Sequence, residues 1–151
     1  AKLINRCHTL KQFEDTYKKL KNAGMEVGVH IINGLPFENE DMMLETAKYL
    51  NKIDVDGVKI HMLNIVKDTA LEKLYKQTGF HLLTKDEYID IVIKQLELLN
   101  EDIVIHRITS DPDPKNLVAP DFLVKKFCLL NDIDKEMKKR DTYQGIKVSS
   151  K

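Results

Sequence analysis

Apolar residues recur at every third or fourth position in five stretches of the chain, which predicts five helices. In the first stretch, Phe13, Tyr17 and Leu20 fall on one helical face. Three shorter runs between the stretches are rich in Val and Ile, as in strands. The first of them, at residues 26–32, is mostly apolar on both faces, as in a strand buried between two layers. The predicted helices cover about residues 10–22, 40–52, 69–77, 84–99 and 120–140, and the predicted strands about residues 26–32, 57–63 and 102–108.

Polar residues and glycines mark the ends of these elements. Thr9 is a predicted N-cap, and Thr84 with Glu87 forms a predicted capping box. Gly24 and Gly79 end the helices before them. The resulting order is α-β-α-β-α-α-β-α, without a hairpin signal, and right-handed crossovers then give an α/β fold with three parallel strands flanked by helices. Such a sheet has two unpaired edges, which invite pairing with another strand.

Length and composition limit the class of protein. The chain has 151 residues, enough for one domain, and its 24 basic and 24 acidic residues cancel, which gives no basic footprint for nucleic acid. Cys7 and Cys128 are the only cysteines, too few for a zinc knuckle or an iron–sulfur motif. There is no signal peptide and no apolar run long enough to span a bilayer, so we expect a cytoplasmic protein that has no membrane partner.

Each predicted strand carries one histidine near its C-terminal end: His30, His61 and His106. In parallel α/β folds, ligands bind at the C-terminal ends of the strands. We therefore expect the three side chains to face a common site and to line a ligand. A His₃ metal site is one alternative, because imidazole is a common metal ligand. A structural role for each ring is the other.

Three further features precede or follow these strands. Gly34, in a Gly-Leu-Pro turn, would let the backbone approach a ligand closely, although such a turn can also simply end a strand. Arg107 and the nearby Asp111 could meet a charged substrate or form a salt-bridged loop. Arg6, just before a helix start, could clamp a carboxylate or lie on the surface.

Taken together, several segments resemble the back half of a radical S-adenosylmethionine protein of the YhcC-like subgroup, which is related to the Elongator catalytic subunit and the oxygen-independent coproporphyrinogen oxidases. The segments are residues 5–9, 29–36, 56–61, 104–107 and 141–145. The resemblance implies that residues 1–143 form the C-terminal half of a partial (β/α)₆ TIM-like barrel, followed by a flexible tail at residues 144–151. It also implies that the chain is a fragment of a longer enzyme.

The same resemblance assigns site residues. In related members the arginine of Arg-x-His contacts S-adenosylmethionine, and the position of His30 often holds an aspartate that contacts the ribose. The implied cofactor-binding residues are Arg6, His30, Gly34 and Asn64, and the implied substrate-lining residues are His61, His106 and Arg107. No catalytic residue and no metal ligand is predicted within the chain.

The superfamily holds a [4Fe–4S] cluster on three clustered cysteines, and the chain has no such triplet. We therefore expect S-adenosylmethionine and the cluster in the full-length parent, and no catalysis by this chain alone. Expected partners are the N-terminal half of the same barrel, a small-molecule or RNA substrate, and a second copy through exposed sheet edges. A non-catalytic α/β ligand-binding or scaffold domain and a His₃ metalloenzyme are the alternative functions.

Overall fold

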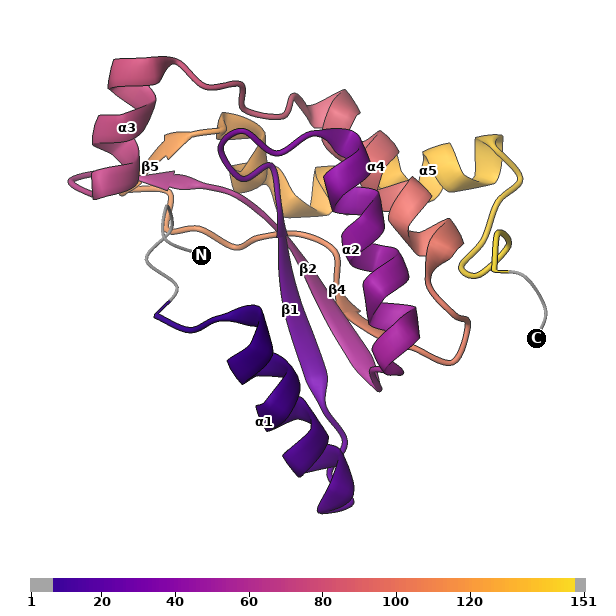
Figure 1. The fold of residues 1–151 in the computed structure, drawn as a ribbon. Helices are drawn as coiled ribbons and strands as arrows, with labels where there is room; N and C mark the ends of the chain where they lie inside the picture. The colour runs from indigo at the N-terminus through magenta and orange to yellow at the C-terminus, as the bar shows by residue number, and fades with distance from the viewer. Residues whose placement is uncertain (1–6, 149–151) are drawn as a thin grey trace.

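Three parallel strands form the central sheet of the chain, whose residues 7–148 are described by a computed structural model. The strands are β1 (Gly28–Asn33), β2 (Gly57–Met62) and β4 (Val104–Arg107), in the order β1-β2-β4. Both neighbouring pairs are parallel, which confirms the sheet expected from the alternation of helices and strands. All three strands end at the upper side of Figure 1.

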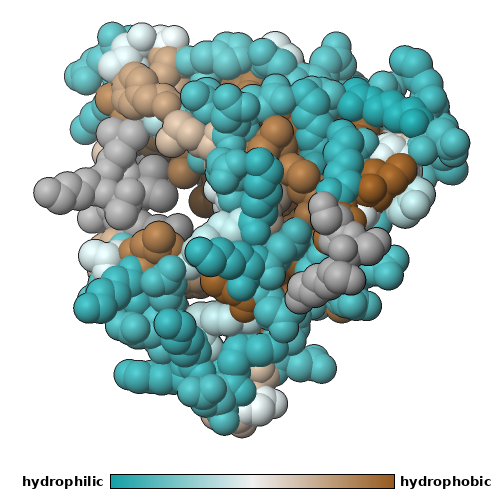
Figure 2. Space-filling view, turned by 45° about the vertical axis from the view of Figure 1, so that its right-hand side comes forward, coloured by the Kyte–Doolittle hydropathy of each residue, from teal (hydrophilic) through white to brown (hydrophobic). Residues whose placement is uncertain are grey.

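Helices cover one face of this sheet. Helix α1 (Leu10–Asn22) lies against α2 (Glu40–Ile53), where the Tyr17 hydroxyl donates to the Asp54 carbonyl at 2.7 Å. Helix α4 (Lys85–Leu98) packs beside α2, and α5 (Lys126–Lys139), preceded by the 3-10 turn η1 (Asp121–Lys125), packs beside α4 (Figure 1). The outer side of these last helices is mostly hydrophilic (Figure 2). Among residues 7–148, no helix is long and apolar enough to cross a membrane.

The predicted caps are confirmed. Thr9 and Thr84 each accept a hydrogen bond from the third residue of the helix that they cap, and both complete a capping box. Gly79 ends α3 (Ala70–Thr78) in the left-handed region.

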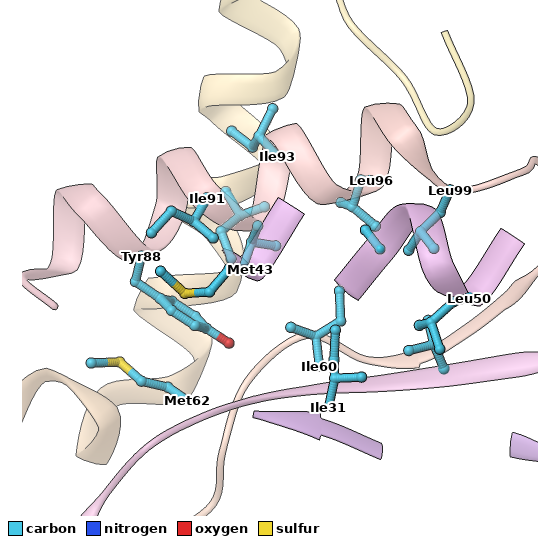
Figure 3. Packing of buried hydrophobic residues seen from close by; sticks show 14 of the residues in the cluster. Ile31, Met43, Leu50, Ile60, Met62, Tyr88, Ile91, Ile93, Leu96 and Leu99 are labelled. Carbon is cyan, nitrogen blue, oxygen red and sulfur yellow. The ribbon is translucent and has the colours of Figure 1, made fainter. Parts of the chain in front are cut away.

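The hydrophobic core lies between the sheet and the helices. Ile31 and Ile60 point from β1 and β2 toward α2 and α4, as Figure 3 shows. A buried polar pair lies in the same layer: the side chains of Asn33 and Gln95 exchange hydrogen bonds of 2.7 and 2.9 Å, and Gln95 also donates to the Met43 carbonyl. This pair fixes the end of β1 to α4, because buried amides are costly unless they are paired.

Three features differ from the sequence-based expectations. Strands β3 (Ile65–Val66) and β5 (Leu117–Ala119) form an antiparallel pair that, with α3, lies beyond the C-terminal ends of the main strands (Figure 1). Strands of two and three residues are too short to show a period of two. The expected burial of both faces is wrong for β1, in which exposed and buried residues alternate. The last helix starts as a 3-10 turn.

The segment at residues 144–148, which the composition favours as part of a flexible tail, is hydrogen-bonded in the structure. The amides of Gly145 and Lys147 donate to carbonyls at the end of α4, and the Gln144 side chain donates to the carbonyls of Asn100 and Ile103. Most of these bonds use backbone groups, which leave no pattern in a sequence.

Candidate functional site

The uncovered face of the sheet gathers basic side chains from all three strands. In the register of the sheet, His30 of β1 is level with Lys59 of β2, and Lys59 is level with Arg107 of β4. Residues in register on neighbouring strands point to the same face. Together with His61 and His106, these residues form what we call the basic face. The face is open to solvent, since Ile32, which lies on it, is 41% exposed.

His30 and His61 lie together at the C-terminal side of the basic face. Their rings stack, with centroids 5.2 Å apart and planes inclined by 24°. His61 is level with Ile32, two positions beyond His30, so the two rings meet diagonally across the strands. The structure thus brings together two of the three expected histidines.

His106 occupies a different place from the one expected. It is the extra residue in an irregularity between the pairs Val58–Ile105 and Lys59–Arg107. Its ring lies over Gly57, where an added Cβ would be 2.5 Å from Nε2, and near Gly28. Those glycines begin β2 and β1, so His106 covers the amino-terminal side of the face. The expectation of equivalent positions on the three strands is therefore wrong for His106.

The electrostatics of the stacked pair favour neutral rings. Burial lowers the pKa of His30, and the positive charges of Lys59 and Arg107 lower it further. Burial also lowers the pKa of His61, with smaller contributions from His30, Arg107 and Lys59. The Nε2 atom of His61 is buried and has no hydrogen-bond partner among the described residues. Such an atom is costly in isolation and can bind a ligand atom.

Lys59 is the residue of this face that sequence reasoning missed. The sequence includes Lys59 only within the segment 56–61 that carries the resemblance, and no role is predicted for it. Its spacing from His61 is the available signal, because residues two apart on a strand share a face. Among the ion pairs found within residues 7–148, none involves Lys59 or Arg107.

Two other predicted site residues, Gly34 and Asn64, follow the ends of β1 and β2. Gly34 is buried with φ of +81°, a conformation that favours glycine, and an added Cβ would be 3.1 Å from the Leu83 side chain, so the local structure already accounts for this glycine. Asn64 follows β2 and is half-buried. Glu38 accepts a hydrogen bond from the Leu35 amide, and burial raises the pKa of its carboxyl. Arg6 lies outside the described residues.

A metal site receives no support from this geometry. Within the part of the chain that the structure describes, no three His, Cys, Asp or Glu side chains lie close enough together to hold a metal ion. The position of His106 explains this for the three strand histidines, because its ring lies over the glycines and not beside the stacked pair.

The chain is similar to a known protein family and to individual curated proteins. Residues 55–139 match the family described as the Radical_SAM C-terminal domain. The uncharacterised protein YtqA of Bacillus subtilis is 41% identical over 145 residues, which are 96% of this chain and 45% of YtqA. Protein YhcC of Escherichia coli is 25% identical over 132 residues, which cover 87% of this chain and 43% of YhcC.

A solved structure shares the fold. The archaeal Methanocaldococcus infernus Elp3, with an N-terminal deletion, superposes with a TM-score of 0.82 over 95% of this chain and 34% of that chain, at 21% identity. The chain spans less than half the length of the curated relatives reported above. The resemblance to the YhcC-like subgroup and to Elongator proteins is thus confirmed. Because the family match covers more than half of its residues, the chain belongs to the family of radical SAM C-terminal domains.

Proposed function

We propose that the chain is the C-terminal half of a radical S-adenosylmethionine enzyme and supplies part of its cofactor and substrate site. The observation that carries the proposal is the uncovered basic face of a parallel sheet whose opposite face is packed against helices. In a barrel the helices lie outside and the uncovered face lines the cavity, with ligands near the C-terminal strand ends.

The chain's own residues do not fit the iron–sulfur cluster. Cys7 and Cys128 are separated by 120 residues, and the described residues hold no metal-binding group. In the proposed enzyme, the cluster ligands therefore come from the other half of the barrel. The cluster, when bound, would supply the one electron needed to cleave a carbon–sulfur bond of S-adenosylmethionine into methionine and an adenosyl carbon radical.

The proposed roles of the residues follow their places on the sheet. His30, Gly34 and Asn64 lie on or directly after β1 and β2 and would contact S-adenosylmethionine, together with Arg6. His61, His106 and Arg107 would line the cavity for the substrate, a small molecule or an RNA nucleotide. The protein residues bind and orient the two ligands and exclude water from them. No catalytic group is assigned within the chain.

The free edge of β1 supports a proposed partner. Among the strands of residues 7–148, whose order in this sheet is β1-β2-β4, β1 has a neighbour on one side only. An unpaired edge strand presents amides and carbonyls that another strand can pair with. We propose that a strand from the N-terminal half of the barrel fills this edge in the whole enzyme. In the isolated chain, the same edge can pair with a second copy, and light scattering at several concentrations would measure that association.

A chimera tests the proposed function. This chain replaces the 45% of Bacillus subtilis YtqA that it matches. The chimera is purified without oxygen, loaded with iron and sulfide, reduced, and incubated with S-adenosylmethionine. We expect 5′-deoxyadenosine from the chimera and none from this chain alone. Intact YtqA is the positive control. A chimera that shows the absorbance of a [4Fe–4S] cluster but forms no 5′-deoxyadenosine, where YtqA does, contradicts the proposal and favours a scaffold role for the chain.

A further inference from the structure

We infer that the basic face binds an anionic group of the substrate, a phosphate or a carboxylate, with Lys59 and Arg107 as its charged donors and the His30–His61 pair beside them. The inference rests on the proposed function, because it takes the basic face as the lining of a ligand cavity. It adds the chemical class of the substrate and a binding residue, Lys59, that neither the resemblance nor the comparisons assign.

The first argument is unbalanced charge on one face of a neutral chain. The chain has equal numbers of acidic and basic residues, and many of its lysines are paired with carboxylates. Two acids near the basic face in sequence, Asp56 and Asp111, already have cationic partners. Asp56, just before β2, binds Lys21 at 2.5 Å, and Asp111 binds Lys126 at 2.7 Å. The bond to Lys126 lowers the pKa of the Asp111 carboxyl, and the charge of Arg107 is a smaller cause of the same shift.

The second argument is the geometry of the cationic groups. His30, Lys59 and Arg107 form a row straight across three strands. Neighbouring strands are about 4.8 Å apart, so the row spans roughly 10 Å at the backbone. Lysine and arginine side chains are long enough to converge on one oxyanion over such a span. An arginine fork and an ammonium group together donate several charge-assisted hydrogen bonds, which an oxyanion with two or three oxygens can accept.

The third argument is the unused hydrogen-bonding capacity of His61. Its Nε2 atom is buried without a partner among the described residues, although the ring lies on the open face of the sheet. An imidazole nitrogen can donate to an oxyanion, and it becomes protonated more readily when one binds. A metal cation fits this face poorly, because Lys59 and Arg107 would repel it.

The experiment is an NMR titration of the histidine rings in the purified chain at constant ionic strength. The probes are inorganic phosphate, adenosine monophosphate and succinate, with adenosine as the uncharged control. We expect saturable shifts of the His30 and His61 resonances and a rise in both pKa values as the anion binds. His81, which is paired with Glu87 at 2.8 Å, is the internal reference and should not move.

Two variants link the shifts to the proposed donors. Lys59→Met should weaken anion binding at least tenfold, whereas Lys59→Arg, which keeps the charge, should largely retain it. Lys139→Met, at an exposed lysine of α5, is the matched control and should leave binding unchanged. Dispersed amide spectra check that each variant is folded. Tighter binding of phosphate probes identifies a phosphorylated substrate group, and tighter binding of succinate identifies a carboxylate.

Three results would overturn the inference. One is the absence of saturable shifts, and another is an equal shift of His81. The third is anion binding that is present in the chain but lost in the YtqA chimera, which would show that the other half of the barrel supplies a carboxylate to this row. The assay for 5′-deoxyadenosine tests the proposed function separately. If the chimera forms 5′-deoxyadenosine but binds no anion, the proposed function stands and the anion site is wrong. If it binds the anion but forms no 5′-deoxyadenosine, the anion site stands and the proposed function is wrong.

Discussion

The two faces of the central sheet are built from alternate residues of the same strands, and they differ in almost every property. On β1, Val29 and Ile31 are buried against the helices, whereas His30 and Ile32 are exposed on the opposite face. The helix side is apolar and closely packed (Figure 3), and the side chains of Asn33 and Gln95 bond to each other within it. The other side carries Lys59 and Arg107, which form no ion pair with another described residue, and a buried His61 nitrogen that has no hydrogen-bond partner within residues 7–148.

This difference means that one face of the sheet stabilises the fold and the other face is suited to binding a ligand. The helix side provides the apolar burial that holds the strands in place. The basic face contributes little to that burial, and its unpaired charges oppose folding through mutual repulsion. A surface that is unfavourable for folding and yet rich in donors is typical of a ligand site. Substitutions on the two faces should therefore differ in size and in what they affect.

The largest effect is expected from Ile60→Ala, which removes a fully buried side chain from the middle strand. The change should lower the free energy of unfolding by about 3 kcal/mol, through lost transfer energy and the cavity that remains. Ile32→Ala, at the exposed position, should cost below about 1 kcal/mol. Urea denaturation measures both. Equal losses would show that the second face is as well packed as the first.

Gln95→Leu tests the polar pair of the helix side. The variant leaves the Asn33 amide and the Met43 carbonyl without their buried partner. It should cost about 1–3 kcal/mol, the usual penalty for a buried polar group that loses its hydrogen bond. The double variant Asn33→Leu/Gln95→Leu should recover part of this loss. If the single and double variants unfold at the same urea concentration, the pair does not act as a unit.

Gly57→Ala tests the contact between the glycine and the His106 ring. The added Cβ would lie 2.5 Å from Nε2 and 3.2 Å from the Val104 carbonyl. The ring must move, at a cost of about 1 kcal/mol, within the range for overpacking. The cost should shrink in a His106→Ala background and keep only the part due to the carbonyl. A double-mutant cycle gives the coupling energy. A coupling energy of zero would show that the His106 ring does not lie over Gly57.

The smallest effect is a pH dependence. The pKa values of His30 and His61 lie below their ordinary value of 6.5, so the unfolded chain binds protons more readily. The stability that the neutral rings confer is present above about pH 6.5 and is lost as the pH falls through their lower folded pKa values. Glu38, whose pKa is raised, acts in the opposite direction.

The comparison is therefore made between the chain and the variant His30→Gln/His61→Gln, because Glu38 is the same in both. Urea midpoints measured from pH 7.5 down to pH 5 should fall less steeply in the variant. Parallel curves would contradict the pKa assignment for the stacked pair.

Most helices were predictable because apolar residues recur at helical spacing and caps mark several of their ends, and the main strands were predictable as runs rich in Val and Ile. Thr84 with Glu87, and Gly79, fixed helix ends that the structure reproduces. The β3–β5 pair was not predictable, because strands this short carry no period. The site residues also differ in how far they were predictable. Alternation along the strands places His30 and His61 on one face. The place of His106 depends on an irregularity in the pairing of β4 with β2. No local sequence pattern reports such a register shift.

Lys59 shows a different limit. Its face could be read from the spacing to His61, but its lack of an ion pair depends on where distant acids lie in space. Asp56 is only three residues away and binds Lys21 of α1 instead. The excess of positive charge on one face is thus a property of the folded chain, whereas the sequence reports only the net charge of all residues.

The most direct test of the account is a crystal structure of the YtqA chimera with S-adenosylmethionine bound. The account predicts the ligand on the uncovered face, near the C-terminal ends of β1 and β2, on the same side of the sheet as His30 and His61. A ligand bound on the helix side of the sheet, among the core residues around Ile31 and Ile60, would contradict it.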